Sequence, residues 1–156
     1  MKNDAVIIGA GHAGGMTAIS LRQRQYQGSI TLIGEEKFLP YQRPALSKGF
    51  LAGEIEEKRL YLKSQDYFDK NNIRIIRNCK VVAIDRNNKT ILLENQKQLG
   101  YEKLVIATGS IVNKLKTSSK ETDLHYLRTI RDSLKIREKL RNKNKITHHW
   151  RRLHRS

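Results

Sequence analysis

Three glycines near the start of the chain limit its fold more than any other feature. Gly9, Gly11 and Gly14 form a G-x-G-x-x-G turn directly after residues 5–8, a short apolar run whose β-branched residues predict a strand. A mostly apolar stretch follows and predicts a helix, and residues 29–33 predict a second strand. The connection is long enough for a parallel crossover, so this region predicts a βαβ unit.

The place of the glycine turn inside this unit indicates dinucleotide binding. In such a turn Gly9 permits the tight bend, Gly11 lets a pyrophosphate approach the backbone, and Gly14 lets helix and strand pack closely. The N-terminus of the helix would face the phosphates with free N–H groups. Glu35 lies 21 residues after Gly14 and would bind the adenosine ribose. Glu36 is the other candidate for the ribose; we prefer Glu35 because it follows the strand more directly. The context makes a glycine-rich turn without a ligand the weaker interpretation.

The rest of the chain predicts further elements of an α/β fold. Pro44 suits the first turn of a short helix, and Ser64 is a candidate N-cap for a helix that ends near residues 71–72. Thr129 and Asp132 resemble a capping box before an amphipathic helix that ends near Asn142. Further strand-like runs are residues 73–76, a hairpin of 81–84 with 90–93, segment 101–110 and the start of a strand at 145–147. Because segment 101–110 is nearly all apolar before its glycine, we expect this strand to be buried on both faces.

Five segments together resemble the FAD-binding region of the ferredoxin, rubredoxin and putidaredoxin reductases. They are the glycine turn 9–15, the strand 30–35, Leu-Pro-Tyr-x-Arg-Pro-x-Leu-Ser-Lys at 39–48, Tyr-x-x-Leu-Val-Ile-Ala-Thr-Gly-Ser at 101–110 and Tyr-Leu-Arg-Thr at 126–129. The resemblance covers about residues 4–147 and implies an α/β, Rossmann-like FAD-binding domain with a parallel sheet and a β-meander, which is incomplete. Proteins of this family pass electrons from NAD(P)H through FAD to a small iron–sulfur protein.

The resemblance also implies roles for residues at matching positions. Ala13 and Gly14 would lie against the FAD pyrophosphate, with Gly9 and Gly11 in the same turn. Arg43 would lie close to the cofactor phosphates. Lys48 would approach the isoalloxazine ring, where a cation stabilises the negative charge of reduced flavin, and it is the one candidate catalytic residue. For Arg43 and Lys48 the alternative is an ordinary surface cation.

The same resemblance assigns contacts from the second half of the chain. Val82, or alternatively Val81, would contact the adenine side of FAD through its backbone. Ala107, Thr108 and Gly109 would pass under the cofactor, and Arg128 would touch it. For Thr108 and Gly109 the alternative is a plain turn at the end of a strand.

The single cysteine, Cys79, argues against thiol–disulfide chemistry. Disulfide reductases with a similar cofactor fold carry a pair of redox cysteines, often soon after the second strand, where this chain has residues 36–43 and no cysteine. We expect Cys79 to be a packed or partly exposed thiol in a reducing cytoplasm. No apolar run is long enough to span a bilayer, no signal peptide is visible, and we predict no metal site.

The tail has a composition of its own. The chain carries a net charge of +16, and residues 114–156 hold 14 of its 31 Lys and Arg against 4 of its 15 acidic residues. Shifting residues 148–155 by one base in a back-translation gives Ile-Ile-Gly-Gly-Gly-Tyr-Ile-Gly, the turn that opens the NAD(P)H-binding domain in the resembling family. We therefore divide the chain into a partial FAD-binding domain, 1–147, and a basic tail, 148–156, and hypothesise a frameshift after Thr147. A genuine basic tail is the alternative.

The expected function is the FAD-binding part of an NAD(P)H-dependent oxidoreductase whose partner is an acidic iron–sulfur protein, and we expect the fragment to be inactive alone. A single-domain nucleotide-binding regulatory module is one alternative. A fragment of a monodehydroascorbate or nitrite reductase-type flavoprotein is another. Nucleic-acid binding through the basic C-terminal part is disfavoured, because Trp150 is the one stacking candidate we identify there.

Overall fold

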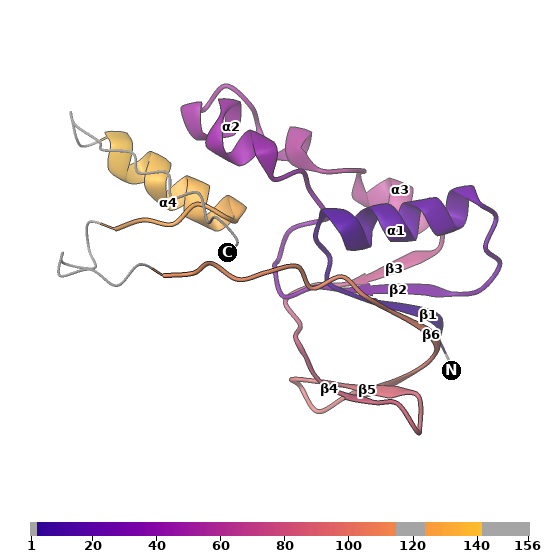
Figure 1. The fold of residues 1–156 in the computed structure, drawn as a ribbon. Helices are drawn as coiled ribbons and strands as arrows, with labels where there is room; N and C mark the ends of the chain where they lie inside the picture. The colour runs from indigo at the N-terminus through magenta and orange to yellow at the C-terminus, as the bar shows by residue number, and fades with distance from the viewer. Residues whose placement is uncertain (1–2, 115–123, 142–156) are drawn as a thin grey trace, which may run out of the picture.

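The centre of the described chain is a six-stranded sheet with the strand order β3-β2-β1-β6-β5-β4 (Figure 1). The computed structural model describes residues 3–114 and 124–141. Its strands are β1 (Asn3–Ile8), β2 (Ile30–Ile33), β3 (Ile73–Ile76), β4 (Val81–Asp85), β5 (Thr90–Leu93) and β6 (Gln98–Ile106). Its helices are α1 (His12–Gln23), α2 (Gly49–Ala52), α3 (Gln65–Lys70) and α4 (Ile130–Arg141), with 3₁₀ turns η1 (Pro44–Ser47) and η2 (Glu57–Leu60). The strand predicted at 145–147 and the tail 148–156 lie outside the described residues.

One half of the sheet is parallel. β1 pairs with β2 on one side and with β6 on the other, and β2 pairs with β3, all in parallel. α1 forms the crossover between β1 and β2, so the predicted βαβ unit is confirmed. The register places Ile8 opposite both Ile33 and Ile106, so these three strands end together at one edge of the sheet.

The other half is an antiparallel meander that leads into β6. The predicted hairpin is β4–β5, and β5 then pairs with the start of β6 up to Gly100. Two expectations for the last strand are wrong. It runs from Gln98 to Ile106 rather than over 101–110, and it is not buried on both faces, because Ile106 is 63% exposed. The reason is that the pairing with β5 stops at Gly100, so within the described residues the later part of β6 has a paired strand on one side only.

Two apolar layers enclose the sheet. α1 and α3 cover one face, and the β4–β5 hairpin lies toward the other (Figure 1). On the helical side Ile7 packs with Ile19 and Phe68, and on the opposite side Val6 packs with Ile91. Val6 and Ile7 are neighbours in β1 whose side chains are both fully buried on opposite faces, which is the two-residue periodicity of a strand.

α4 packs on the segment that follows β2. The predicted capping box is confirmed: the Asp132 N–H donates to Thr129 Oγ1 at 3.2 Å, and the Thr129 N–H donates to Asp132 Oδ2 at 2.9 Å. The buried Ser133 hydroxyl donates to the carbonyl of Leu46 in η1 at 2.9 Å. Ile130 is fully buried in the same small core, so the start of α4 is fixed next to η1.

Candidate functional site

The candidate site lies at the edge where β1, β2 and β6 end. The Gly9 N–H, directly after β1, donates to the Ile33 carbonyl at 2.8 Å, and the Ala107 N–H, directly after β6, donates to the Ile8 carbonyl at 2.7 Å. These bonds continue the strand pairing by one residue into the turns. Ligands of open α/β sheets bind at the carboxyl ends of the strands, which is this edge.

Two of the three glycines are required by packing. Gly9 has a φ of +106°, and a Cβ there would lie 2.2 Å from the Ala107 carbonyl oxygen and 2.9 Å from the Thr108 nitrogen. At Gly14 a Cβ would lie 1.9 Å from the Gly9 carbonyl oxygen. These distances are shorter than any van der Waals contact, so both positions exclude a side chain whether or not a ligand binds.

Gly11 is different, because packing does not require it. A Cβ placed there would meet one atom within 4 Å among the described residues, Arg43 Nη2 at 4.0 Å, and the φ of −77° and ψ of −166° are open to any residue. The space in front of Gly11 is therefore free. Gly11 is also the N-cap of α1, so the helix N-terminus with its unsatisfied N–H groups and positive dipole end opens onto this space.

One arginine lies at each of the two glycine turns, Arg43 at Gly11 and Arg128 at Gly109. Arg43 Nη1 donates to the Arg128 carbonyl oxygen at 2.5 Å, and Arg43 Nη2 lies beside Gly11. Arg128 Nη2 lies 3.5 Å from the position of a Cβ at Gly109, which has a φ of +72°. Segments distant in the sequence thus bring two cations and two glycine turns together.

The two candidate ribose carboxylates have different surroundings. Glu35 is exposed, with Oε1 4.0 Å from Lys80 Nζ. Glu36 is turned toward the protein: Oε2 accepts a hydrogen bond from the Tyr41 hydroxyl at 2.7 Å, and Oε1 lies 3.1 Å from Arg43 Nη2. Burial and the Glu36 carboxylate raise the pKa of Tyr41, so its hydroxyl remains a proton donor. This arrangement leaves Glu35 as the open carboxylate.

Of the remaining predicted residues, Ala13 belongs to the glycine turn, whereas Lys48 and Val82 lie on other parts of the surface. Ala13 is exposed in the first turn of α1, and Lys48 is exposed at the junction of η1 and α2. Val82 is 52% exposed on the edge strand β4, whereas Val81 packs against the core. The structure therefore gathers the glycine turn, residues 107–109 and both arginines, while Lys48 and Val82 come from separate elements.

The sequence did not indicate the contacts that hold Arg43 and Arg128 in place. Tyr41 is 2% exposed, and its hydroxyl accepts a hydrogen bond from the Ile130 N–H at 3.4 Å. Asp132 accepts from the Arg128 N–H at 3.2 Å. The signal for Tyr41 was its place two residues before Arg43 in the quoted motif, but nothing local indicates a partner 89 positions later.

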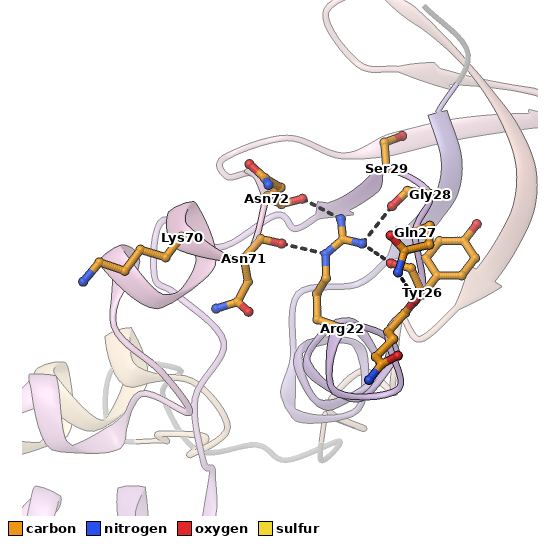
Figure 2. A pocket seen from close by; sticks show the side chains of 9 residues that line it. Arg22, Tyr26, Gln27, Gly28, Ser29, Lys70, Asn71 and Asn72 are labelled. Carbon is orange, nitrogen blue, oxygen red and sulfur yellow. Dashed lines mark hydrogen bonds between the residues drawn. The ribbon is translucent and has the colours of Figure 1, made fainter.

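A cavity at the opposite edge of the sheet is a poor alternative site. It has a volume of about 530 Å³ and is lined by Arg22, Gln25, Tyr26, Gln27, Gly28, Ser29, Lys70, Asn71 and Asn72 (Figure 2). The Arg22 guanidinium donates to backbone carbonyls at 2.6 Å (Asn71), 2.9 Å (Gly28) and 3.0 Å (Asn72), and also to that of Tyr26. Because its donors are used by the protein, Arg22 joins the α1–β2 and α3–β3 connections instead of binding an anion.

Outside the candidate site, the described residues include one cysteine and no cluster of metal-ligating side chains. Cys79 is 5% exposed, and burial raises the pKa of its thiol, which fits a packed side chain rather than a nucleophile. Among the described residues no cluster of His, Cys, Asp and Glu has the arrangement of a metal site. Within the same ranges no helix has the length and apolarity needed to cross a membrane.

Comparison with known proteins gives matches along nearly the whole chain. The family model of the pyridine nucleotide-disulphide oxidoreductases matches residues 3–148. A rubredoxin-NAD(+) reductase of Pseudomonas putida is 40% identical over 136 residues, which cover 86% of this chain and 35% of that protein. Putidaredoxin reductase from the same organism is 34% identical over 149 residues, covering 93% of this chain and 35% of that protein.

Solved structures agree with the sequence matches. The putidaredoxin reductase–putidaredoxin complex superposes with a TM-score of 0.84 at 34% identity, over 88% of this chain and 34% of that one. NADH:rubredoxin oxidoreductase from Clostridium acetobutylicum also gives 0.84, at 36% identity, over 93% and 37% of the two chains. The chain thus spans about a third of the length of these relatives. Both its sequence and its α/β fold place it in the pyridine nucleotide-disulphide oxidoreductase family.

Proposed function

We propose that this chain is the FAD-binding part of an NAD(P)H-dependent flavoprotein oxidoreductase that passes electrons to a ferredoxin- or rubredoxin-type iron–sulfur protein. Two of the relatives named above are reductases of rubredoxin and putidaredoxin. The chain spans about a third of their length, so the activity and the acidic iron–sulfur partner are proposed for the protein to which this part belongs.

The observation that carries the proposal is the free space at Gly11. Gly9 and Gly14 are explained by packing within the chain, but Gly11 is not, since among the residues that the structure describes a Cβ there would meet only the end of the Arg43 side chain. A glycine without a packing reason, at a helix N-terminus and beside a cation, fits the close approach of a phosphate to the backbone. The residues present therefore fit the pyrophosphate of a dinucleotide.

Each predicted residue has a role in this proposal. The backbone at Gly9, Gly11, Ala13 and Gly14 would hold the pyrophosphate, with Arg43 beside it. Glu35 would accept hydrogen bonds from the adenosine ribose, and Val82 would contact the adenine side through its backbone. Residues 107–109 would pass under the cofactor, next to Arg128.

Lys48 is the residue proposed to act on the flavin itself. When bound, FAD accepts a hydride from a nicotinamide and releases electrons to an acceptor. The Lys48 ammonium group would stabilise negative charge on the isoalloxazine ring of reduced FAD, which would raise the reduction potential of the flavin. Lys48 is exposed, so it can reach a ligand without first breaking a buried contact.

We propose that the 156-residue polypeptide alone does not carry out the full reaction. Hydride transfer requires a nicotinamide held against the flavin, and its sequence contains one G-x-G-x-x-G turn, which is assigned to FAD. We expect weak FAD binding without NADH-driven dye reduction.

The test is a titration of the flavin-free chain with FAD and, as a matched control ligand, riboflavin, which lacks the pyrophosphate and adenosine. The proposal expects FAD to bind at least about tenfold more tightly, since charge-assisted hydrogen bonds to phosphate distinguish the two ligands. Equal affinities would contradict a pyrophosphate site. Dye reduction by NADH with stoichiometric flavin would contradict the proposed inactivity of the isolated chain.

A further inference from the structure

A carboxylate lies directly beside the arginine of the proposed phosphate site. Glu36 has Oε1 at 3.1 Å from Arg43 Nη2 and Oε2 at 2.7 Å from the Tyr41 hydroxyl, so each of its oxygens has a partner. The Glu36 and Arg43 side chains are both 32% exposed. Glu36 is therefore fixed between a tyrosine and an arginine, at the rim of the space in front of Gly11.

The Arg43 guanidinium is held from three directions. Glu36 binds Nη2, the Arg128 carbonyl accepts from Nη1 at 2.5 Å, and the guanidinium carbon lies 5.3 Å from the centre of the Tyr41 ring. Tyr41 is itself buried, and its hydroxyl also accepts from the Ile130 N–H. Tyr41, which contacts both Glu36 and Arg43, is thus hydrogen-bonded to the start of α4. The Arg43 guanidinium has five N–H donors, enough to bind both the protein and a ligand.

Charge alone gives no reason for a carboxylate here. A negative side chain next to a phosphate repels it and offsets part of the attraction of Arg43. An Arg side chain that moves freely, however, loses conformational entropy when it binds. A carboxylate that fixes the guanidinium in advance removes that cost and so offsets the repulsion.

We propose that Glu36 is a positioning residue that, with Tyr41, fixes Arg43 for contact with the phosphates of a dinucleotide. The inference rests on the proposed function and assigns Glu36 to the phosphate end of the site. It differs from the alternative in which Glu36 binds the ribose directly. The two roles, and simple electrostatics, predict different outcomes when the carboxylate is removed.

The test is a double-mutant cycle on the affinity of the 156-residue chain for FAD, with Glu36→Ala, Arg43→Ala and the double variant. Positioning predicts that Glu36→Ala weakens binding by about fivefold although it removes a negative charge, and Arg43→Ala by about tenfold or more. The double variant binds no more weakly than Arg43→Ala alone, because Glu36 acts through Arg43. Glu36→Gln, whose amide can still accept from Arg43, restores most of the affinity.

The matched control is Glu57→Ala. Glu57 is a half-buried carboxylate that accepts a hydrogen bond from the Tyr61 hydroxyl, as Glu36 does from Tyr41, and no described contact joins it to Arg43. Glu57→Ala removes one negative charge and one tyrosine–carboxylate hydrogen bond, as Glu36→Ala does. We expect this control variant to bind FAD with wild-type affinity. If Glu36→Ala does not fold, Tyr41→Phe carries the cycle, since it removes one of the two contacts that fix the carboxylate.

Shorter ligands separate the phosphate role from the ribose role. Positioning predicts that Glu36→Ala weakens ADP but leaves adenosine unchanged, and equal loss for both would overturn it in favour of ribose binding. Wild-type or tighter FAD binding by Glu36→Ala, or additive effects in the cycle, would also overturn it. If the wild-type chain itself shows no preference for FAD over riboflavin, the proposed function fails, which is a separate result.

Discussion

Replacing Gly11 by alanine separates ligand binding from folding, because the structure assigns this glycine no packing role. The added Cβ would lie 4.0 Å from Arg43 Nη2 and the backbone angles suit alanine. Gly11 is the N-cap of α1, where alanine is poorer than glycine, so we expect a loss of at most about 1 kcal/mol in the free energy of unfolding.

The same methyl group would stand where a phosphate approaches the backbone. Loss of charge-assisted hydrogen bonds to the helix N-terminus would cost about 1.5–3 kcal/mol of binding free energy, or roughly tenfold to more than a hundredfold in the Kd for FAD. Gly14→Ala is the contrasting variant, since its Cβ would lie 1.9 Å from the Gly9 carbonyl oxygen. We expect it to lose about 3 kcal/mol of stability or to fail to fold.

The assays are urea unfolding followed by circular dichroism and FAD titration of each folded variant. We expect Gly11→Ala to unfold at a urea concentration close to that of the wild type and to bind FAD much more weakly. Wild-type FAD affinity in Gly11→Ala would refute the close-approach argument. A loss of stability as large as that of Gly14→Ala would refute the assignment of free space at Gly11.

Four further predictions concern the fold. Cys79 should react with a thiol reagent at pH 8 at least about a hundredfold more slowly than the unfolded chain, because it is buried and its thiol pKa is raised, and a rate equal to that of the unfolded chain would contradict its burial. Because the thiol pKa is raised, the folded state holds the thiol proton more tightly than the unfolded state. The free energy of unfolding should therefore fall as pH rises above the pKa of the unfolded thiol. If the difference in unfolding free energy between the wild type and Cys79→Ala does not change with pH, this prediction is wrong. Ser64→Ala should cost about 1 kcal/mol in urea unfolding, since Ser64 Oγ accepts the Tyr67 N–H at 3.3 Å, and no measurable change would mean that this cap is not formed. Ile106 and Ile111 are 63% and 88% exposed, and we expect these apolar side chains to favour association of the chain. Replacing both by lysine should lower light scattering of concentrated samples without a loss of stability beyond about 0.5 kcal/mol per site, and unchanged scattering would contradict this expectation.

Local patterns were sufficient to predict most elements of the fold. The glycine turn after an apolar run predicted the βαβ unit, and Ser64 and the pair Thr129 and Asp132 marked the starts of two helices. Caps and turns are decided by side chains within three or four residues of one another, so they can be read from a single sequence.

Features that depend on distant segments could not be predicted in the same way. The apolar composition of β6 indicated burial, but Ile106 is exposed, and the pairing of β6 with β5 extends only to Gly100. From the sequence, Glu36 was considered only as a ribose ligand. Its contact with Tyr41 could not be predicted, because Tyr41 is held by the Ile130 N–H of α4, far along the chain. The path of the chain between such positions is set by tertiary packing, which a local pattern does not contain.

The central claim is that a dinucleotide binds at the turn between β1 and α1. An amide chemical-shift titration of the ¹⁵N-labelled chain with FAD tests it most directly, because each backbone N–H reports its own surroundings. The account predicts that the largest changes fall on Gly11 and Ala13, followed by residues 107–109. Changes confined to the cavity around Arg22, or the absence of any specific change at saturating FAD, would contradict it.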